Sequence, residues 1–170
     1  METDIKRIAV LAAQKETENQ DFRYFVKYWD DDDDPELIGM VSEVAAYYSE
    51  RIKCGDCANC CKVLNVPLNH NDIHRLSQRF GMSEEIFVEK YLEEGEGGLQ
   101  IRQQPCPFLD GNKCSVYDIR PDECRDYPYL DREIVSRMWG VIDRSAQCPI
   151  VYNVLEELKT RTGFRRKKRR

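Results

Sequence analysis

The sequence predicts a mainly helical fold with one short β-hairpin and long irregular segments between the helices. Three observations lead to this prediction. Apolar residues recur at helical spacing in several stretches, residues typical of helix N-termini precede most of these stretches, and one Asp-Gly pair indicates a tight turn. A chain of 170 residues is long enough for one small domain with a modest core.

Residues 1–30 are predicted to be mostly helical. Their apolar residues follow the 3.6-residue period of a helix in two groups, one around Ile8 and one around Phe22. Five consecutive aspartates follow at 30–34. We interpret them as a solvated linker and not as metal ligands, because neighbouring like charges repel one another and stay hydrated.

A longer helix is predicted at residues 35–52. Asp34 and Pro35 are typical of an N-cap and of the first residue of a helix. The apolar residues that follow lie on one face at helical spacing. This helix leads directly to the first cysteine, Cys54.

Two shorter helices are predicted after an extended stretch at 63–68. Asn69 or Asn71 begins the first of them, Gly81 ends it, and Ser83 begins the second. Glycines then interrupt the helical pattern before the next element.

The β-hairpin is predicted at the Asp110-Gly111 pair, which is a strong signal for a two-residue turn. Such a turn places Cys114 opposite Pro107, one step from Cys106. The thiols of the two cysteines are then expected to approach one ion.

Three further elements complete the prediction. Residues 99–101 alternate like a short strand, Pro121 begins a helical turn that contains Cys124, and residues 150–161 form the last helix. The backbone N–H groups and the helix dipole at the start of such a turn are expected to favour a thiolate.

Cysteine spacing is the most informative feature of the chain. The first four cysteines form a CxxCxxCC run, and four more follow. A short CxxC loop can turn its backbone around a metal, so that two thiolates reach one ion. All eight cysteines are predicted to be metal ligands: Cys54, Cys57, Cys60, Cys61, Cys106, Cys114, Cys124 and Cys148.

The donor type narrows the choice of metal. Thiolates are soft ligands that suit zinc, copper(I) and iron–sulfur clusters, and four cysteines are a usual set for zinc or for a cluster. Eight thiolates are therefore enough for two sites. Adjacent side chains diverge, so Cys60 and Cys61 are expected to serve two nearby ions or to bridge them. Buried thiols or disulfides explain the clustering less well.

Two known cysteine patterns do not match fully. The run agrees with the first three cysteines of the bacterial ferredoxin pattern CxxCxxCxxxCP, but its fourth cysteine follows at once. A radical-SAM pattern, CxxxCxxC, fails because Leu64 stands where its last cysteine belongs. Basic residues beside the cysteines in sequence are expected to stabilise thiolates: Lys53, Lys62, Lys113, Arg120 and Arg125.

Three blocks of sequence occur in order: the CxxCxxCC run, Pro-Cys-Pro-Phe-Leu at 105–109, and the stretch from Cys114 to Pro128. Together they closely resemble the YkgJ-type family, also called the CxxCxxCC family, of zinc- or iron-chelating domains. The resemblance covers roughly residues 50–150, and all eight characteristic cysteines of the family have counterparts here. It implies metal binding through thiolates.

The function expected from these features is that of a metal-binding protein, with zinc or an iron–sulfur cluster as the cofactor. The metal is expected to be largely structural, and the surface to bind a protein partner. The alternative is an iron–sulfur redox or methyl-transfer accessory enzyme, with a cluster at Cys54, Cys57, Cys60 and one remote cysteine. Metal storage or delivery is a third class. The sequence identifies no catalytic residue and no phosphate loop, catalytic triad or dinucleotide fingerprint.

We expect three parts along the chain: an N-terminal helical extension at 1–49, a cysteine-rich metal-chelating domain at 50–150, and a C-terminal helix with a basic tail at 151–170. The last six residues are all basic, and removing them from the net charge of −5 leaves −11 on the remainder. Such a tail can attract nucleic acid only without specificity, and the acidic body opposes this.

The sequence also supports predictions about the cellular location, the two histidines and the two tryptophans. No stretch is suited to a signal peptide or a membrane span, and clustered cysteines suit a reducing compartment, so we expect a cytoplasmic protein without a membrane partner. His70 and His74 share a helix face, and we expect them to face solvent and not to bind metal. Trp29 and Trp139 are expected in the core.

Overall fold

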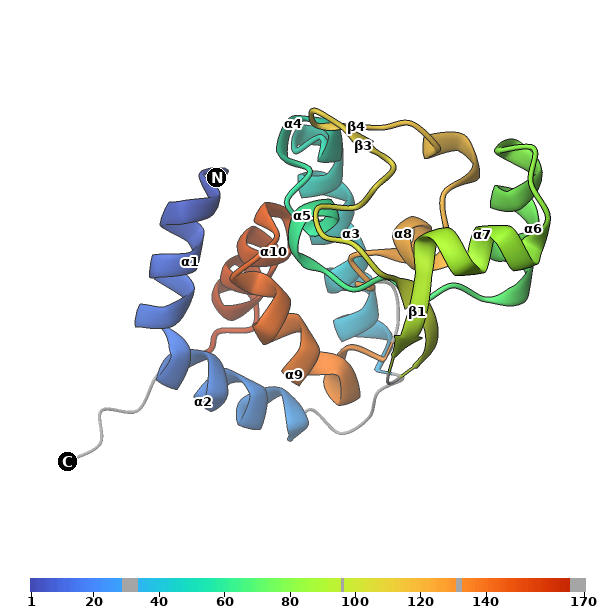
Figure 1. The fold of residues 1–170 in the computed structure, drawn as a ribbon. Coiled ribbons are helices and arrows are strands. Elements are labelled where there is room, and N and C mark those ends of the chain that lie inside the picture. Colours follow the sequence, from blue (N-terminus) through green and yellow to red (C-terminus); the bar gives the residue numbers. More distant parts are fainter. Residues whose placement is uncertain (29–33, 96, 131–132, 166–170) are drawn as a thin grey trace. The chain divides into compact units, whose positions relative to one another are not determined.

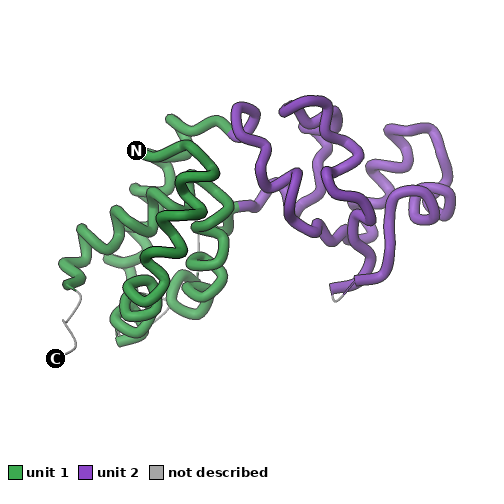
Figure 2. The backbone as a smooth tube through the Cα atoms, turned by 60° about the vertical axis from the view of Figure 1, so that its left-hand side comes forward, with its two compact units in different colours: residues 1–53, 128–170 green, residues 54–127 purple. Residues whose placement is uncertain are grey.

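The computed structural model describes residues 1–28, 34–95, 97–130 and 133–165. It is mainly helical with small antiparallel hairpins, which confirms the predicted fold class. Contacts within the chain divide it into two compact units: unit 1 comprises residues 1–53 and 128–170, and unit 2 comprises residues 54–127 (Figure 2). The division expected from the sequence, at 1–49, 50–150 and 151–170, stays a prediction.

Unit 1 is a helical bundle whose central helix is α10 (Pro149–Arg161). Its other helices, within the described residues, are α1 (Ile5–Gln14), α2 (Glu16–Lys27), α3 (Pro35–Arg51) and α9 (Ile134–Ser145) (Figure 1). Helix α10 contacts α1, α3 and α9, and most of its side chains are buried. A helix that is buried nearly all round forms the core of its unit.

Side-chain caps fix the starts of two helices in unit 1. The carboxylate of Asp4 accepts a hydrogen bond from the backbone N–H of Arg7 at 2.9 Å and begins α1. Asp34 accepts one from the N–H of Glu36 at 2.8 Å, with Pro35 at the first position of α3. This confirms the helix start predicted at Asp34. The aspartates at 30–33 and Trp29 lie outside the described residues.

Helix α9 was not predicted from the sequence. Glu133, in the left-handed conformation with φ 51°, precedes it and makes no side-chain cap. The side chains of Ile134, Met138 and Val141 form its buried stripe. Trp139 lies off this stripe and is 60% exposed, so its expected place in the core was wrong.

A buried lysine on α10 gives a stability prediction. The ammonium of Lys159, with its residue only 5% exposed, donates to Glu18 at 2.8 Å, to Asn19 at 2.6 Å and to Glu156 at 2.6 Å. We expect Lys159→Ala to lower the free energy of unfolding by about 3 kcal/mol, because it leaves buried acceptors without their donor. Chemical denaturation followed by helix content measures this loss.

The matched control is Arg161→Ala on the same helix. Arg161 pairs with Glu43 and Glu157 on the exposed surface, where ion pairs contribute little. An equal loss of stability in both variants would contradict a special role for the buried lysine.

In unit 2, a hydrophobic core is built by α6 (His70–Arg79), α7 (Glu84–Tyr91) and the hairpin of β1 (Leu92–Gly95) with β2 (Gly98–Ile101). Asn69 and Asp72 form a capping box at the start of α6, and the hydroxyl of Ser83 caps α7, which confirms the predicted starts. The buried core residues are Leu68, Ile73, Leu76, Phe87, Leu92, Ile101, Phe108 and Val116.

The two hairpins of unit 2 differ from the sequence prediction. Strand β2 contains the strand predicted at 99–101, but its partner β1, with Leu92 opposite Ile101, was not predicted. Two glutamates and a glycine make β1 a weak strand signal.

The predicted register of the second hairpin was also wrong. In β3 (Leu109–Asp110) and β4 (Lys113–Cys114), Cys114 pairs with Leu109 and not with Pro107. The reversal lies one residue later than expected, because Gly111, at φ 59°, takes the first central position of the turn.

The remaining elements of unit 2 are short. They are α4 (Cys54–Cys57), α5 (Cys60–Val63), the 3₁₀ turn η1 (Tyr117–Ile119) and α8 (Asp122–Asp126), and none of them contains a buried residue. Within the described parts of the chain, the helices are too short or too polar to cross a bilayer.

Candidate metal centre

Two single helical turns hold the CxxCxxCC run. Cys54 and Cys57 lie three residues apart in α4, so their side chains share a face of that turn, and Cys60 and Cys61 begin α5. Between the turns, the buried Ala58 adopts the left-handed conformation with φ 49° and redirects the chain. The run therefore folds back on itself and does not continue as one helix.

Hydrogen bonds join the second hairpin and the residues before it to the CxxCxxCC run. The backbone N–H of Cys106 donates to the carbonyl of Cys61 at 2.8 Å. At the turn, Asn112 accepts from the ammonium of Lys62 at 2.8 Å and donates to the carbonyl of Asp56 at 3.3 Å. These bonds hold the chain segments of Cys61 and Cys114 close together.

The thiol of Cys61 has a lowered pKa. Its sulfur lies 3.9 Å from the sulfur of Cys60. The hydrogen bond from Cys60 lowers the pKa of Cys61 to about 7, against the opposing effect of burial, and the nearby charge of Lys62 adds to the lowering. A thiol with a pKa of about 7 is roughly half ionised at pH 7, and the thiolate is the form that binds metals.

The neighbouring thiols have raised pKa values. Burial raises the pKa of Cys106 to about 11 and that of Cys124 to about 12, and burial also raises the pKa of Cys54 and Cys114. In all four cases the negative charge of Cys61 raises the pKa further, so these cysteines lie near Cys61. Burial at Cys124 thus opposes the thiolate that the start of α8 is expected to favour, and that expectation stays a prediction.

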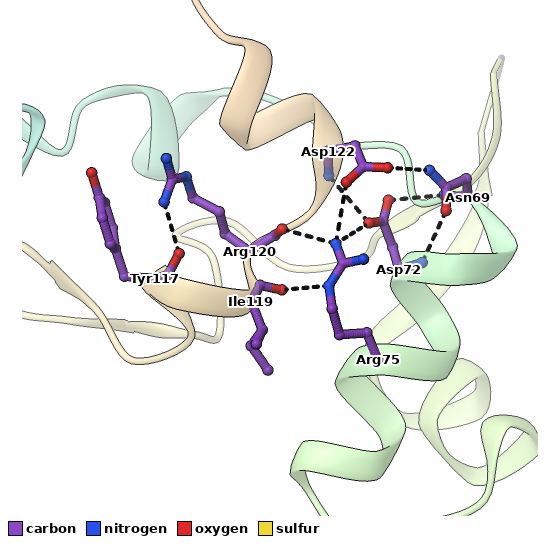
Figure 3. Close-up of polar contacts among 7 residues, drawn as sticks. All are labelled: Asn69, Asp72, Arg75, Tyr117, Ile119, Arg120 and Asp122. Carbon is purple, nitrogen blue, oxygen red and sulfur yellow. Dashed lines mark hydrogen bonds and ion pairs between the residues drawn. The ribbon is translucent and has the colours of Figure 1, made fainter.

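Arg120 supplies positive charge to this neighbourhood. Its charge lowers the pKa of Cys54, Cys114 and Cys124, against the larger effect of burial. The guanidinium donates to the carbonyl of Tyr117 at 2.8 Å and lies 4.0 Å from the centre of the Tyr117 ring (Figure 3). The sequence pointed to Arg120 through its place beside the cysteines, and the structure identifies Tyr117 as the residue that orients it.

A charge-removing variant tests the role of Arg120. We expect Arg120→Gln to weaken metal binding several-fold, because thiolate ligands lose a compensating cation, and Arg120→Lys to restore most of the affinity. Competition with a chromophoric chelator at low and high salt measures both effects. The control is Arg79→Gln, which removes the same charge from the exposed end of α6. Equal affinities for Arg120→Gln and this control would contradict the role.

The structure thus places seven of the eight predicted ligands in unit 2. The eighth, Cys148, lies in unit 1, where it is buried and precedes α10 as its N-cap residue. All eight are thiols and not disulfides among the residues that the structure describes. Within those same residues, no three Cys, His, Asp or Glu side chains already have the geometry of a metal site. The cysteines therefore form a neighbourhood of donors and not a completed coordination shell.

The two histidines face solvent, as predicted. The side chains of His70 and His74 are 82% and 57% exposed. Each of them pairs through Nδ1 with the carboxylate of Glu84, at 3.6 Å and 2.8 Å. These contacts join the starts of α6 and α7 at the surface of unit 2.

Comparisons with known proteins agree with the cysteine pattern. A family model described as "CxxCxxCC: Putative zinc- or iron-chelating domain" matches residues 53–149, which is more than half of the chain. No curated protein matches the chain significantly. No solved structure does so either.

Proposed function

The chain belongs to the CxxCxxCC family of zinc- or iron-chelating domains, and from this premise we propose that its cysteines bind a transition metal as thiolates. One observation carries the proposal. Cysteines from three separate chain segments of unit 2 gather around Cys61, whose thiol has a lowered pKa. Packing alone does not require so many thiols in one neighbourhood.

The donor set fits zinc or iron. Soft thiolates suit both metals, and four of them give a zinc site a net charge of −2. The positive charge of Lys62 lowers the pKa of Cys61, and that of Arg120 lowers the pKa of Cys124, so both cations offset part of the negative charge of such a site. A bound cation would also stabilise the thiolate forms of Cys106 and Cys124, which are protonated at neutral pH without it. Ligand assignment to individual cysteines, Cys148 included, is part of this proposal.

We propose that the metal is largely structural. The three helical turns that carry cysteines, α4, α5 and α8, contain no buried residue of their own. Turns of this length are not stable alone, so an ion that binds several of them converts binding energy into folding energy. We propose further that the protein surface binds a partner protein and that the chain works in the reducing cytoplasm, where unbound thiols are kept from forming disulfides.

An iron–sulfur protein is the second candidate. Cys54, Cys57 and Cys60 keep the CxxCxxC spacing of a ferredoxin run, and Cys54 is exposed, as suits a cluster near the surface. With one remote cysteine they would bind a cluster for a redox or methyl-transfer accessory function.

Anaerobic purification from metal-replete medium, followed by elemental analysis and an absorption spectrum, tests the proposal. We expect at least one equivalent of zinc or iron per chain. A zinc protein is colourless, whereas an iron–sulfur protein is brown and bleaches on reduction. Less than one equivalent of any transition metal would contradict metal binding, and the spectrum separates the two candidates.

A further inference from the structure

A polar cluster on α6 contacts the turn at residues 119–122, which connects Cys114 with Cys124 (Figure 3). The sequence indicated Asn69 or Asn71 as a helix cap and assigned no role to Asp72 or Arg75. In the structure, the side chains of Asn69, Asp72 and Arg75 reach across to the turn.

Arg75 binds the backbone of the turn. Its guanidinium donates to the carbonyl of Ile119 at 3.2 Å and to the carbonyl of Arg120 at 3.0 Å. It also pairs with Asp72 at 2.6 Å and with Asp122 at 3.3 Å. The planar guanidinium of an arginine sets both the direction and the distance of its acceptors, whereas the ammonium of a lysine does not set their direction.

Asp72 adds a buried acceptor. It is 1% exposed, and its carboxylate accepts from the backbone N–H groups of Asn69, at 3.2 Å, and of Asp122, at 3.1 Å. From the other side, the amide of Asn69 donates to the carboxylate of Asp122 at 2.9 Å. A buried carboxylate is costly without partners, so Asp72 holds Arg75 and the turn firmly in this arrangement.

The turn needs such support. Pro121 has no N–H to donate, and α8, which follows and contains Cys124, is five residues long with no buried residue. The adjoining, apolar side of α6 meanwhile packs Ile73 and Leu76 into the core, against which Cys106 and Cys114 are partly buried. One helix therefore supports the cysteine segments through polar and apolar contacts.

We propose that Asp72 and Arg75 are positioning residues of the metal centre, which hold the turn at 119–122 so that Cys114 and Cys124 are in place for metal binding. This inference rests on the proposed function. It assigns a role to α6, which contributes no cysteine. Loss of residues that orient metal ligands typically lowers metal affinity by 10- to 100-fold.

The test titrates metal-free protein with Co²⁺ under anaerobic conditions and follows the sulfur-to-cobalt charge-transfer absorption. Arg75→Gln is expected to lower the affinity at least about tenfold and to weaken the charge-transfer band, because fewer thiolates reach the ion. Arg75→Lys is expected to recover part of the affinity. Hydrogen exchange should become faster at 119–126 and remain unchanged in β1 and β2. Arg79→Gln, on the same helix, should behave as the wild type.

A second variant keeps the test decisive if Arg75→Gln does not fold. Asn69→Asp preserves the helix cap, since aspartate caps as well as asparagine, but it replaces the bond to Asp122 with repulsion. It is expected to lower the Co²⁺ affinity several-fold with α6 intact.

Three outcomes remain distinct. A wild-type protein without a charge-transfer band would refute the proposed function itself. A wild-type band together with unchanged affinity and spectrum in the folded variants would refute only the positioning role. Variants that lose melting temperature but keep the full band and affinity would show that the cluster is merely structural, which also overturns the inference.

Discussion

Removal of the bound metal is expected to release the segments of Cys54–Cys61 and Cys124 in unit 2 while its hydrophobic core stays folded. The segments at 54–63 and 122–127 contain the short turns α4, α5 and α8, which bury no residue. The stretch from α6 to β2 instead shares a core around Leu76 and Phe87. Binding of a structural zinc ion contributes on the order of 10 kcal/mol, so the segments without a core depend most on the metal.

Hydrogen exchange with mass spectrometry, before and after chelation under reducing conditions, measures this difference. Amides at 54–63 and 122–127 are expected to lose most of their protection, whereas those of α6 and α7 change little. Helix α10, which is buried in unit 1, is an internal reference. Equal protection of the cysteine segments with and without metal would contradict a structural role and would favour a functional site instead.

Replacement of Cys61 by serine is expected to have the largest effect of any single substitution on metal content. The thiol of Cys61 has a lowered pKa, and its sulfur lies 3.9 Å from the sulfur of Cys60. Its negative charge raises the pKa of Cys106 and Cys124, which belong to the other two cysteine segments. Serine keeps the shape but is a poor ligand for soft metals. We expect the loss of most bound metal and a melting temperature that falls by more than ten degrees, given the size of the metal contribution.

Cys114→Ser is expected to act in the same direction, and Asp110→Ser is its matched control. Asp110 is an exposed residue of β3 in the same hairpin, so the control changes that hairpin without removing a thiol or a neighbouring cation. Metal content and melting curves should be normal in the control. Half the metal with an unchanged melting curve in either cysteine variant would point to a functional ion and not to a structural one.

The helices with clear caps could be predicted from the sequence. Asp34, Asn69 and Ser83 begin α3, α6 and α7 as expected, because each side chain satisfies N–H groups of the next turn. Elements without such signals were missed. Helix α9 begins after Glu133 in a left-handed conformation, and β1 consists largely of charged residues. The apolar residues of α9 do follow helical spacing and were overlooked without a cap, whereas β1 depends on its pairing with β2.

The candidate site shows the same limit. Cysteine spacing directed attention to the seven thiols of unit 2, whose role as metal ligands stays a prediction. The sequence did not predict the pairing of Cys114 with Leu109, because a shift of the glycine turn by one residue changes the register of the hairpin. Nor did the sequence indicate Asp72 and Arg75, because their contacts join segments more than forty residues apart. It did not indicate Tyr117 either, because the contact of Tyr117 with Arg120 depends on the shape of one turn.

X-ray absorption at the metal edge of the anaerobically purified protein tests the central claim most directly. The scattering shell nearest to the ion is expected to consist of sulfur alone, at about 2.3 Å for zinc. A shell of nitrogen and oxygen without sulfur would contradict thiolate binding and with it the proposed function.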